Sequence, residues 1–382
     1  MSDKIVMHGL TFDDVLLIPG YSDFRRADIS LETTLTKKIT LRTPLVSSPM
    51  DTVTESRLAL ELARLGGLGI IHRNLTVAQQ ADEVAKVKKA NHVVGAAIGV
   101  NPGYEERVKA LLTAGADIIC LDSAHGYTNT MLDVLKTLKK QYRGIEIMAG
   151  NIATAEAAGA FAAAGADTLR AGMGPGSICT TRIISGMGMP QITTILETSK
   201  AVKGTSTTII SDGGVKYSGD MVKALAAGAH AVMSGTFFSS AEEAPGDVHE
   251  LHANEIPRRF KSIVDQNNPD KLYKFKSYRG MGSIGAMNHG AAIKSEDEYH
   301  GKSYKDRVLV AEGVEGLVPV KGSLQMLIDQ AVGGMKSGMY YVGVKTIAEL
   351  QEKSKFIQIT QASLTESHPH DILVTNPGEN YQ

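Results

Sequence analysis

The chain has 382 residues, of which 43% are hydrophobic and 21% are charged, and its 40 basic and 41 acidic residues give a formal net charge of −1. This balance offers no electrostatic support for nucleic-acid binding, which depends on clustered positive charge. No apolar run approaches the ~18 residues of a membrane-spanning helix, and the first residues lack the apolar segment of a signal peptide. With only two cysteines and no disulfide framework, the sequence predicts a globular, cytoplasmic protein.

A short unit recurs along the chain, in which a helix end and a capping glycine lead into an apolar strand. Copies lie at 65–71, 114–121, 164–171 and 227–234. Further strands are predicted at 93–98, 145–149 and 207–211, and helices at 104–114, 130–141 and 219–227. Strands that alternate with helices in this way predict a parallel sheet covered by helices.

Polar and glycine-rich residues follow several of these strands, at 122–126, 150–151, 172–181, 212–214 and 235–236. Functional residues at the carboxyl ends of successive strands are typical of a (β/α)₈ barrel, whereas a doubly wound sheet gathers its ligand at one switch point. We therefore expect an α/β protein in which residues 1–382 form a single catalytic (β/α)₈ TIM barrel.

The region from Asn254 to Pro319 breaks the pattern, because it is polar and carries a charged stretch from Lys294 to Arg307. A long irregular insertion in a barrel is often a lid, although a solvated surface excursion explains the charges equally well. We expect a mobile flap at about 286–310 near the C-terminal part of the barrel. The tail from Gln361 onward is expected to be extended.

The loop from Gly172 to Arg182 is the strongest candidate for chemistry. Its glycines can turn backbone amides toward an anion or carbonyls toward a cation. Cys179 lies in this polar loop, where a nucleophilic thiolate explains it better than a buried packing role does. Cys120, within an apolar strand, is expected to be buried and inert.

Polar groups at other strand ends have two possible roles each, one structural and one in ligand binding. Asp212 can cap a helix or accept hydrogen bonds from a ribose diol, and Asp122 is a similar carboxylate. Gly235-Thr236 is either a simple turn or a phosphate contact. The segment 280–285 matches G-x-G-x-x-G, but no convincing strand is predicted before it, which argues against a Rossmann fingerprint. The histidines at 249, 252, 368 and 370 are expected at the surface rather than on a metal.

Several motifs, in chain order, together resemble the inosine-5′-monophosphate (IMP) dehydrogenase family: LTFDDVLL at 10–17, SSPMDTVTE at 47–55, GPGSICTTR at 174–182, SDGG at 211–214, KSYRGMGS at 276–283, EGVEG at 312–316 and ESHPHD at 366–371. The resemblance implies a barrel that acts as a homotetramer and oxidises IMP to xanthosine monophosphate with NAD⁺, in guanine nucleotide biosynthesis. It implies that Cys179 attacks the purine C2, that hydride leaves to NAD⁺, and that water hydrolyses the resulting thioimidate.

The resemblance also implies roles for individual residues. Catalytic roles fall on Cys179, Thr181, Glu312 and Tyr299. The residues implied to bind the nucleotide are Ser48, Met50, Ser177, Asp212, Gly213, Gly214, Gly235, Thr236, Tyr278, Gly280, Met281, Gly282 and Glu312. The residues implied to meet the cofactor are Asp122, Ser123, Asn151, Gly172, Met173 and Gly174. A K⁺ ion would be held by Gly174, Gly176 and Cys179, with Glu366, Ser367 and His368 from a neighbouring subunit.

The sequence departs from the family pattern at two places. The family usually inserts a pair of cystathionine-β-synthase-type regulatory modules, whereas residues 88–94 here run straight on. The flap of the family carries an Arg-Tyr pair, and the aligned residues here are Glu298 and Tyr299. We therefore expect a Thr181–Glu312 relay to activate the hydrolytic water. The rival bases are Glu298 itself, or Arg307 under a shifted alignment.

Two other functions compete with the dehydrogenase. One is the related guanosine-5′-monophosphate (GMP) reductase, an NADPH-dependent enzyme that converts GMP to IMP and shares the GPGSICTTR motif. It also lacks the Arg-Tyr pair, whereas KSYRGMGSIGAM, EGVEG and the ESHPHD tail favour the dehydrogenase. The other is a nucleotide-binding relative without activity.

Overall fold

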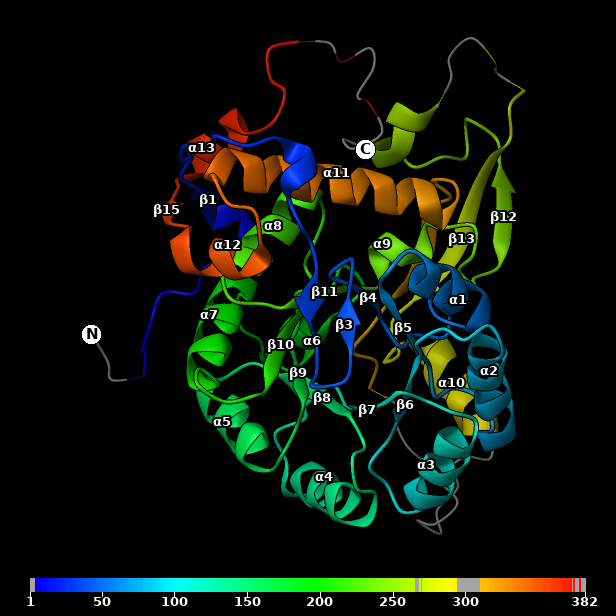
Figure 1. Cartoon of the computed structure of the whole chain (residues 1–382). Helices are drawn as coiled ribbons and strands as arrows, with labels where there is room; N and C mark the ends of the chain where they lie inside the picture. The colour runs from blue at the N-terminus through cyan, green and yellow to red at the C-terminus, as the bar shows by residue number, and fades with distance from the viewer. Residues whose placement is uncertain are drawn as a thin grey trace.

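A computed structural model of the chain describes residues 4–264, 268, 270–293, 310–372, 374 and 378. Its centre is a closed barrel with the strand order β10-β11-β4-β5-β6-β7-β8-β9, in which every pair of neighbours is parallel (Figure 1). The barrel strands are β4 (Leu45–Ser47), β5 (Leu68–Ile71), β6 (Gly95–Ile98), β7 (Ile118–Asp122), β8 (Ile147–Ile152), β9 (Thr168–Ala171), β10 (Thr208–Asp212) and β11 (Ala231–Ser234).

Helices join the strands and surround the barrel (Figure 1). They are α1 (Ser56–Arg64), α2 (Val77–Lys89), α3 (Tyr104–Thr113), α4 (Asn129–Gln141), α5 (Ala155–Ala163), α7 (Gln191–Ala201), α8 (Ser218–Ala226) and α11 (Leu324–Val342). Helix α2 shows why they form: Thr76 and Gln79 make a capping box at its start, and Val84 and Val87 bury its inner face. The expected (β/α)₈ barrel is confirmed.

The inside of the barrel is a packed core and not a channel. Side chains from several strands meet there, among them Val46, Ile70, Cys120, Met148 and Ile210, all fully or almost fully buried. A second apolar layer lies between the strands and the helices α2 to α5. Since the interior is filled, a ligand can be bound only beyond the strand ends.

The connection from α2 to β6 is short, at the point where proteins with similar motifs are expected to carry regulatory modules. Five residues, Ala90–Val94, span it, and Asn91 adopts the left-handed conformation (φ 59°) that asparagine tolerates. Asp117 accepts hydrogen bonds from Lys88 Nζ (2.9 Å) and from the Val94 amide (2.9 Å). The turn is therefore tied to the start of the next strand.

The polar region after residue 254 is more regular than expected. Within it, β13 (Tyr273–Arg279) and β14 (Glu315–Pro319) pair antiparallel, so the prediction of an irregular excursion was wrong for these residues. Strand β12 (Val248–Leu251), which precedes the region, completes this antiparallel sheet. The alternation of apolar and polar residues that marks a strand is not evident in β13, because the charged residue Lys276 is buried. Its ammonium donates to the carbonyls of Ala241 and Glu242 (both 2.9 Å). A strand does precede Gly280, but it pairs antiparallel with β12 and β14, which does not fit the parallel strands of a Rossmann fingerprint.

Two further regions differ in secondary structure from what their composition suggested. Helix α10 (Ile284–Ala292) occupies the first part of the expected flap, and the mobility of the flap stays a prediction. Residues 294–309, with Glu298, Tyr299 and Arg307, lie outside the described residues. The tail is not extended throughout, because Thr360 caps a short helix, α13 (Gln361–Glu366).

The remaining elements lie around the barrel. Strand β1 (Val15–Leu17) pairs antiparallel with β15 (Phe356–Gln358), and β2 (Thr33–Thr34) pairs with β3 (Thr40–Leu41). The short helical elements are η1 (Phe12–Asp14), η2 (Arg26–Asp28), α6 (Thr181–Ile184), α9 (Thr236–Ser239), η3 (Arg258–Ile263) and α12 (Ile347–Lys353). In the described part of the chain, no helix combines the length and apolarity that crossing a membrane requires.

Candidate active site

A cavity of about 1650 Å³ lies at the carboxyl ends of the barrel strands, between them and the β13–β14 region. Most of the residues predicted for the site line it: Ser48, Met50, Asp122, Ser123, Asn151, Gly176, Ser177, Cys179, Thr181, Asp212, Gly213, Gly214, Gly235, Thr236, Tyr278, Gly280, Met281, Gly282 and Glu312. The structure therefore brings together groups that are up to 264 residues apart, as the barrel topology requires.

Six predicted residues do not line this cavity, namely Gly172, Met173, Gly174, Glu366, Ser367 and His368. Gly172 lies just beneath it, with its carbonyl accepting a hydrogen bond from Asn151 Nδ2 (2.9 Å). Met173 forms an isolated bridge with Met189. The ring of His368 packs 6.2 Å from that of Tyr217, which does line the cavity. Tyr299 lies outside the described residues.

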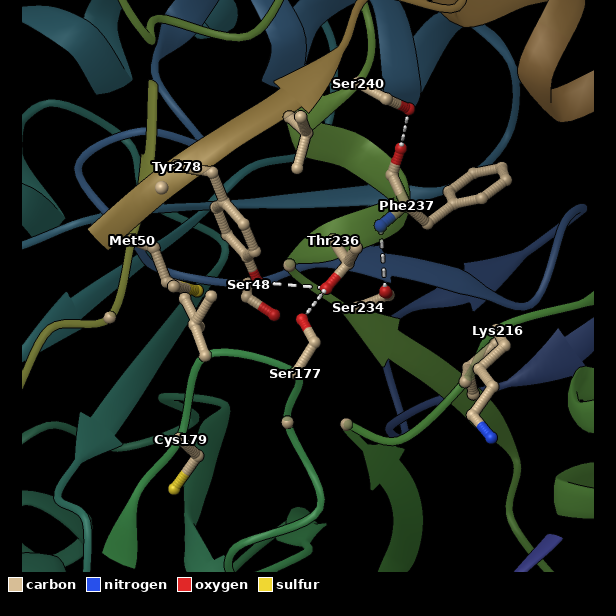
Figure 2. A pocket seen from close by; sticks show the side chains of 18 of the residues that line it. Ser48, Met50, Ser177, Cys179, Lys216, Ser234, Thr236, Phe237, Ser240 and Tyr278 are labelled. Atoms are coloured by element: carbon tan, nitrogen blue, oxygen red, sulfur yellow. Dashed lines mark hydrogen bonds between the residues drawn. The ribbon is translucent and has the colours of Figure 1, made fainter. Parts of the chain in front are cut away.

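Three hydroxyl groups gather at one end of the cavity (Figure 2). Thr236 Oγ1 lies 2.7 Å from Ser177 Oγ and donates to Tyr278 Oη at 3.2 Å. Burial raises the pKa of Tyr278 to about 12, although its hydrogen bond with Thr236 acts in the opposite direction, so the phenol stays neutral and can donate. A Cβ on Gly235 would lie 2.5 Å from this phenol oxygen, so only glycine fits. Such a cluster of neutral donors suits a phosphate group.

The half-buried Cys179 begins a chain of polar contacts that leads to a carboxylate. Its Sγ lies 3.2 Å from Thr181 Oγ1, and Thr181 donates to Glu312 Oε2 at 2.9 Å. Backbone bonds hold this arrangement, because the Thr180 amide donates to the Glu312 carbonyl (3.0 Å) and the Val314 amide donates to the Ile178 carbonyl (2.9 Å). The structure therefore joins a thiol, a hydroxyl and a carboxylate through two successive polar contacts.

Cys120 has the opposite environment, as expected. It is fully buried in the barrel, and burial raises the pKa of its thiol to about 12, against a smaller opposing effect of the Arg170 guanidinium. A neutral, inaccessible thiol is a poor nucleophile. Of the two cysteines, only Cys179 lines the cavity.

Arg170 on β9 is a site residue that sequence analysis missed. Its guanidinium donates to Asp122 Oδ1 at 2.5 Å and to Asp212 Oδ2 at 2.9 Å, and only 7% of its side chain is exposed. Burial opposes its charge, yet the two carboxylates raise its pKa well above the ordinary value. Asn151 Nδ2 adds a hydrogen bond to Asp212 Oδ2 (2.8 Å). The sequence feature that could have revealed Arg170 is a charged residue inside the otherwise apolar strand 168–171.

A second missed cluster holds the glycine-rich segment after β13. Arg279 donates to Asp51 Oδ2 at 2.6 Å, and Asn74 Nδ2 bridges Asp51 Oδ2 and the Ala286 carbonyl, both at 3.1 Å. Hydrogen bonds from Arg279 and Asn74 keep the pKa of Asp51 below its usual value although burial raises it. Asp51 is therefore ionised and anchors the segment that carries Gly280 to Gly282.

The predicted cation ligands include backbone carbonyls of the loop that contains Cys179. Gly174 adopts a left-handed conformation (φ 82°) that turns the loop, and the Gly176 carbonyl already accepts a bond from the Cys179 amide (3.1 Å). Within the described ranges, no group of three or more His, Cys, Asp or Glu side chains is placed to hold a metal ion. A carbonyl site of the kind K⁺ prefers does not depend on such a group.

A (β/α)₈ barrel with a cysteine, a carboxylate and clustered hydroxyls in one cavity at its strand ends has the arrangement of an enzyme active site. The profile of the IMP dehydrogenase / GMP reductase domain matches residues 9–264 and 266–370. The chain therefore belongs to the IMP dehydrogenase / GMP reductase family, which confirms the resemblance seen in its motifs. Both activities in the family name are oxidoreductions, so the chain is an oxidoreductase.

Proteins of the same family are similar to this chain over nearly its full length. An inosine-5′-monophosphate dehydrogenase of Cryptosporidium parvum is 41% identical over 424 aligned positions, covering 100% of both chains. That of Borreliella burgdorferi is 40% identical over 422 positions, covering 97% of this chain and 99% of the relative. That of Aquifex aeolicus is 36% identical over 507 positions, covering 99% of both. The alignment with the Aquifex aeolicus protein is longer than this chain of 382 residues, which is consistent with the absence of the regulatory modules here.

Proposed function

We propose that this chain oxidises IMP to xanthosine 5′-monophosphate with NAD⁺ as the hydride acceptor, in the synthesis of guanine nucleotides. The observation that carries the proposal is the line Cys179–Thr181–Glu312, which lies in one cavity with the hydroxyl cluster and the strand-end carboxylates. A thiol, a relay hydroxyl and a carboxylate are what covalent oxidation followed by hydrolysis requires.

The nucleotide is oriented by contacts at its two ends. Its phosphate accepts hydrogen bonds from Ser177, Thr236 and Tyr278, which already contact one another. Its ribose diol donates to Asp212 at the end of β10. The purine then extends toward Cys179, flanked by a group that also lines the cavity: Ser48, Met50, Gly213, Gly214, Gly235, Gly280, Met281 and Gly282. Fixing both ends holds C2 near the thiol.

The reaction has two stages. Cys179 Sγ bonds to the purine C2 as the thiol proton passes to N3, the other end of the C2–N3 double bond. The hydrogen on C2 then leaves with its electron pair. Bound NAD⁺ supplies the acceptor for this hydride. Water next adds to C2 of the thioimidate, which is protonated on N3, and loses one of its protons. The C–S bond then breaks as the proton of the new C2 hydroxyl passes to the sulfur, which leaves C2=O and regenerates the thiol. Thr181 accepts the proton of the attacking water and passes its own to Glu312, 2.9 Å away.

The cofactor side of the cavity is formed by Asp122, Ser123 and Asn151. Arg73 Nε is buried there and makes no hydrogen bond within the part of the chain described, so it is a donor suited to a polar ligand. Gly172, Met173 and Gly174 lie outside the lining, and we assign them the role of supporting the loop beneath the cofactor. The role of Tyr299 stays a prediction.

We further propose a homotetramer activated by K⁺. The carbonyls of Gly174, Gly176 and Cys179 would hold the ion together with Glu366, Ser367 and His368 of a neighbouring copy. The proposal is supported by exposed apolar side chains next to the cysteine loop, with Ile183 80% and Met187 59% exposed. Sedimentation in K⁺ and in Na⁺ buffers, with activity measured alongside, tests it. An active monomer or a rate independent of K⁺ would contradict it.

A dual-substrate assay tests the proposed function. The purified chain is mixed with IMP and NAD⁺, and separately with GMP and NADPH, while the absorbance of the reduced cofactor is followed. The proposal predicts NADH formation from IMP and no NADPH consumption with GMP. The reverse result would establish a GMP reductase, and binding of IMP without turnover in either mixture would indicate an inactive nucleotide-binding relative.

A further inference from the structure

Arg170 lies between two carboxylates that the proposed function gives to two different ligands. Its two terminal nitrogens donate to Asp122 Oδ1 (2.5 Å) and Asp212 Oδ2 (2.9 Å), which end the strands β7 and β10. Its own strand, β9, pairs directly with β10 and is separated from β7 by β8. One guanidinium therefore spans the floor of the cavity beneath both ligand positions.

We infer that Arg170 is a positioning residue that couples the binding of the nucleotide to the binding of the cofactor; this inference rests on the proposed function. Arg170 contacts Asp122 through Oδ1 and Asp212 through Oδ2. A ribose hydroxyl would then reach Asp212 Oδ1, or Asp122 Oδ2, which lies 3.5 Å from Arg73 Nε. A shift of either carboxylate changes its bond to Arg170. Because the guanidinium is rigid and planar, the shift is passed to the other carboxylate.

The surroundings strengthen this role. Arg170 is almost fully buried, and the network of two carboxylates and one guanidinium is closed by Asn151, which donates to Asp212 Oδ2 (2.8 Å) and to the Gly172 carbonyl (2.9 Å). Arg73 is the other cation near Asp122, at 3.5 Å from Oδ2. Buried charges that share partners respond together when one of them is changed, which is the condition for coupling between sites.

Lysine cannot replace this arginine, because an ammonium on a flexible stem does not hold two separate carboxylates in fixed directions. Arg107 offers a matched control for the loss of a buried guanidinium. It is fully buried between α3 and α2, donates to Gln80 Oε1 (2.7 Å) and to the Leu75 carbonyl (3.1 Å), and does not line the cavity. Arg107→Lys therefore reports on stability alone.

The first experiment compares the kinetics of Arg170→Lys and Arg107→Lys with those of the full-length wild-type chain. We expect Arg170→Lys to raise the KM for IMP and the KM for NAD⁺ by about tenfold or more each, the usual effect of losing a charge-assisted bond. Arg107→Lys is expected to leave both values within about twofold even if its thermal midpoint falls. A rise in only one KM, or equal behaviour of the two variants, would overturn the inference.

The second experiment measures coupling without turnover, by calorimetric titration of IMP in the absence of cofactor. We expect Asp122→Asn to raise the Kd for IMP at least about threefold in the wild-type background and to have no further effect in the Arg170→Lys background. An unchanged Kd in Asp122→Asn, with normal wild-type turnover, would overturn the coupling alone. A wild-type chain that neither binds nor oxidises IMP would overturn the proposed function and this inference together.

Discussion

Thr181 Oγ1 donates a hydrogen bond to Glu312 Oε2 at 2.9 Å, although the two residues are 131 positions apart in the chain. The contact exists because the segment before β14 pairs with the cysteine loop, through the Cys179–Gly313 bridge and the bond from the Thr180 amide to the Glu312 carbonyl. The predicted relay therefore has a direct path from Cys179 to a carboxylate.

Replacement of the carboxylate should separate the two stages of the reaction. Glu312→Gln keeps the shape of the side chain but removes the base, so we expect hydrolysis to slow by about 10²-fold while hydride transfer is spared. Rapid-quench kinetics should then show a burst of NADH equal to the enzyme concentration. The comparison variants are Glu298→Gln and Arg307→Lys, and impairment of the arginine variant alone would show that the relay is wrong.

Tyr278→Phe should weaken nucleotide binding and alter the pH dependence of stability. Loss of the phenol donor should raise the KM for IMP by about tenfold if it contacts the phosphate. The raised pKa of about 12 means that the folded state retains a proton that the unfolded state loses. Stability from this group is therefore lost as the pH rises from about 10 to 12, and that part of the loss should be absent in Tyr278→Phe. Chemical unfolding across this range measures it, and identical pH profiles would contradict the assignment.

Gly172→Ala should damage both the fold and the site. A Cβ there would lie 2.0 Å from the Asp212 carbonyl oxygen, and Gly172 has a φ of 159°. We expect destabilisation of about 2–4 kcal/mol and a raised KM for IMP, because Asp212 must move. Gly159→Ala is the matched control, since nothing lies within 4 Å of its added Cβ and alanine favours helix α5 by about 1 kcal/mol. Equal stability of the two variants in thermal unfolding would contradict this packing.

The local part of the fold was predictable, and the long-range part was not. Strands such as β7, β9 and β11 follow from the glycine and the apolar run that mark each of them. Strand β4 was missed because Leu45–Ser47 has only three residues, too few to show a period. Strand β13 was missed because Lys276 is buried on backbone carbonyls, which only the tertiary structure provides.

In the site too, local sequence features were predictable and contacts between distant segments were not. The cavity residues with local motif signals, including Cys179 and Thr236, were identified from the sequence. Arg170 was overlooked because a buried cation is explained only by partners on other strands, Asp122 and Asp212. Nothing in the local sequence places Glu312 against Thr181. Closure of the barrel and pairing of distant loops decide such contacts.

Covalent catalysis by Cys179 is tested most directly by the intact mass of the protein during turnover with IMP and NAD⁺, quenched in acid. We expect an adduct equal to IMP less two hydrogens, mapped by digestion to Cys179. It should be present in Cys120→Ala and absent, together with all turnover, in Cys179→Ala. Turnover by Cys179→Ala, or an adduct on any other residue, would contradict it.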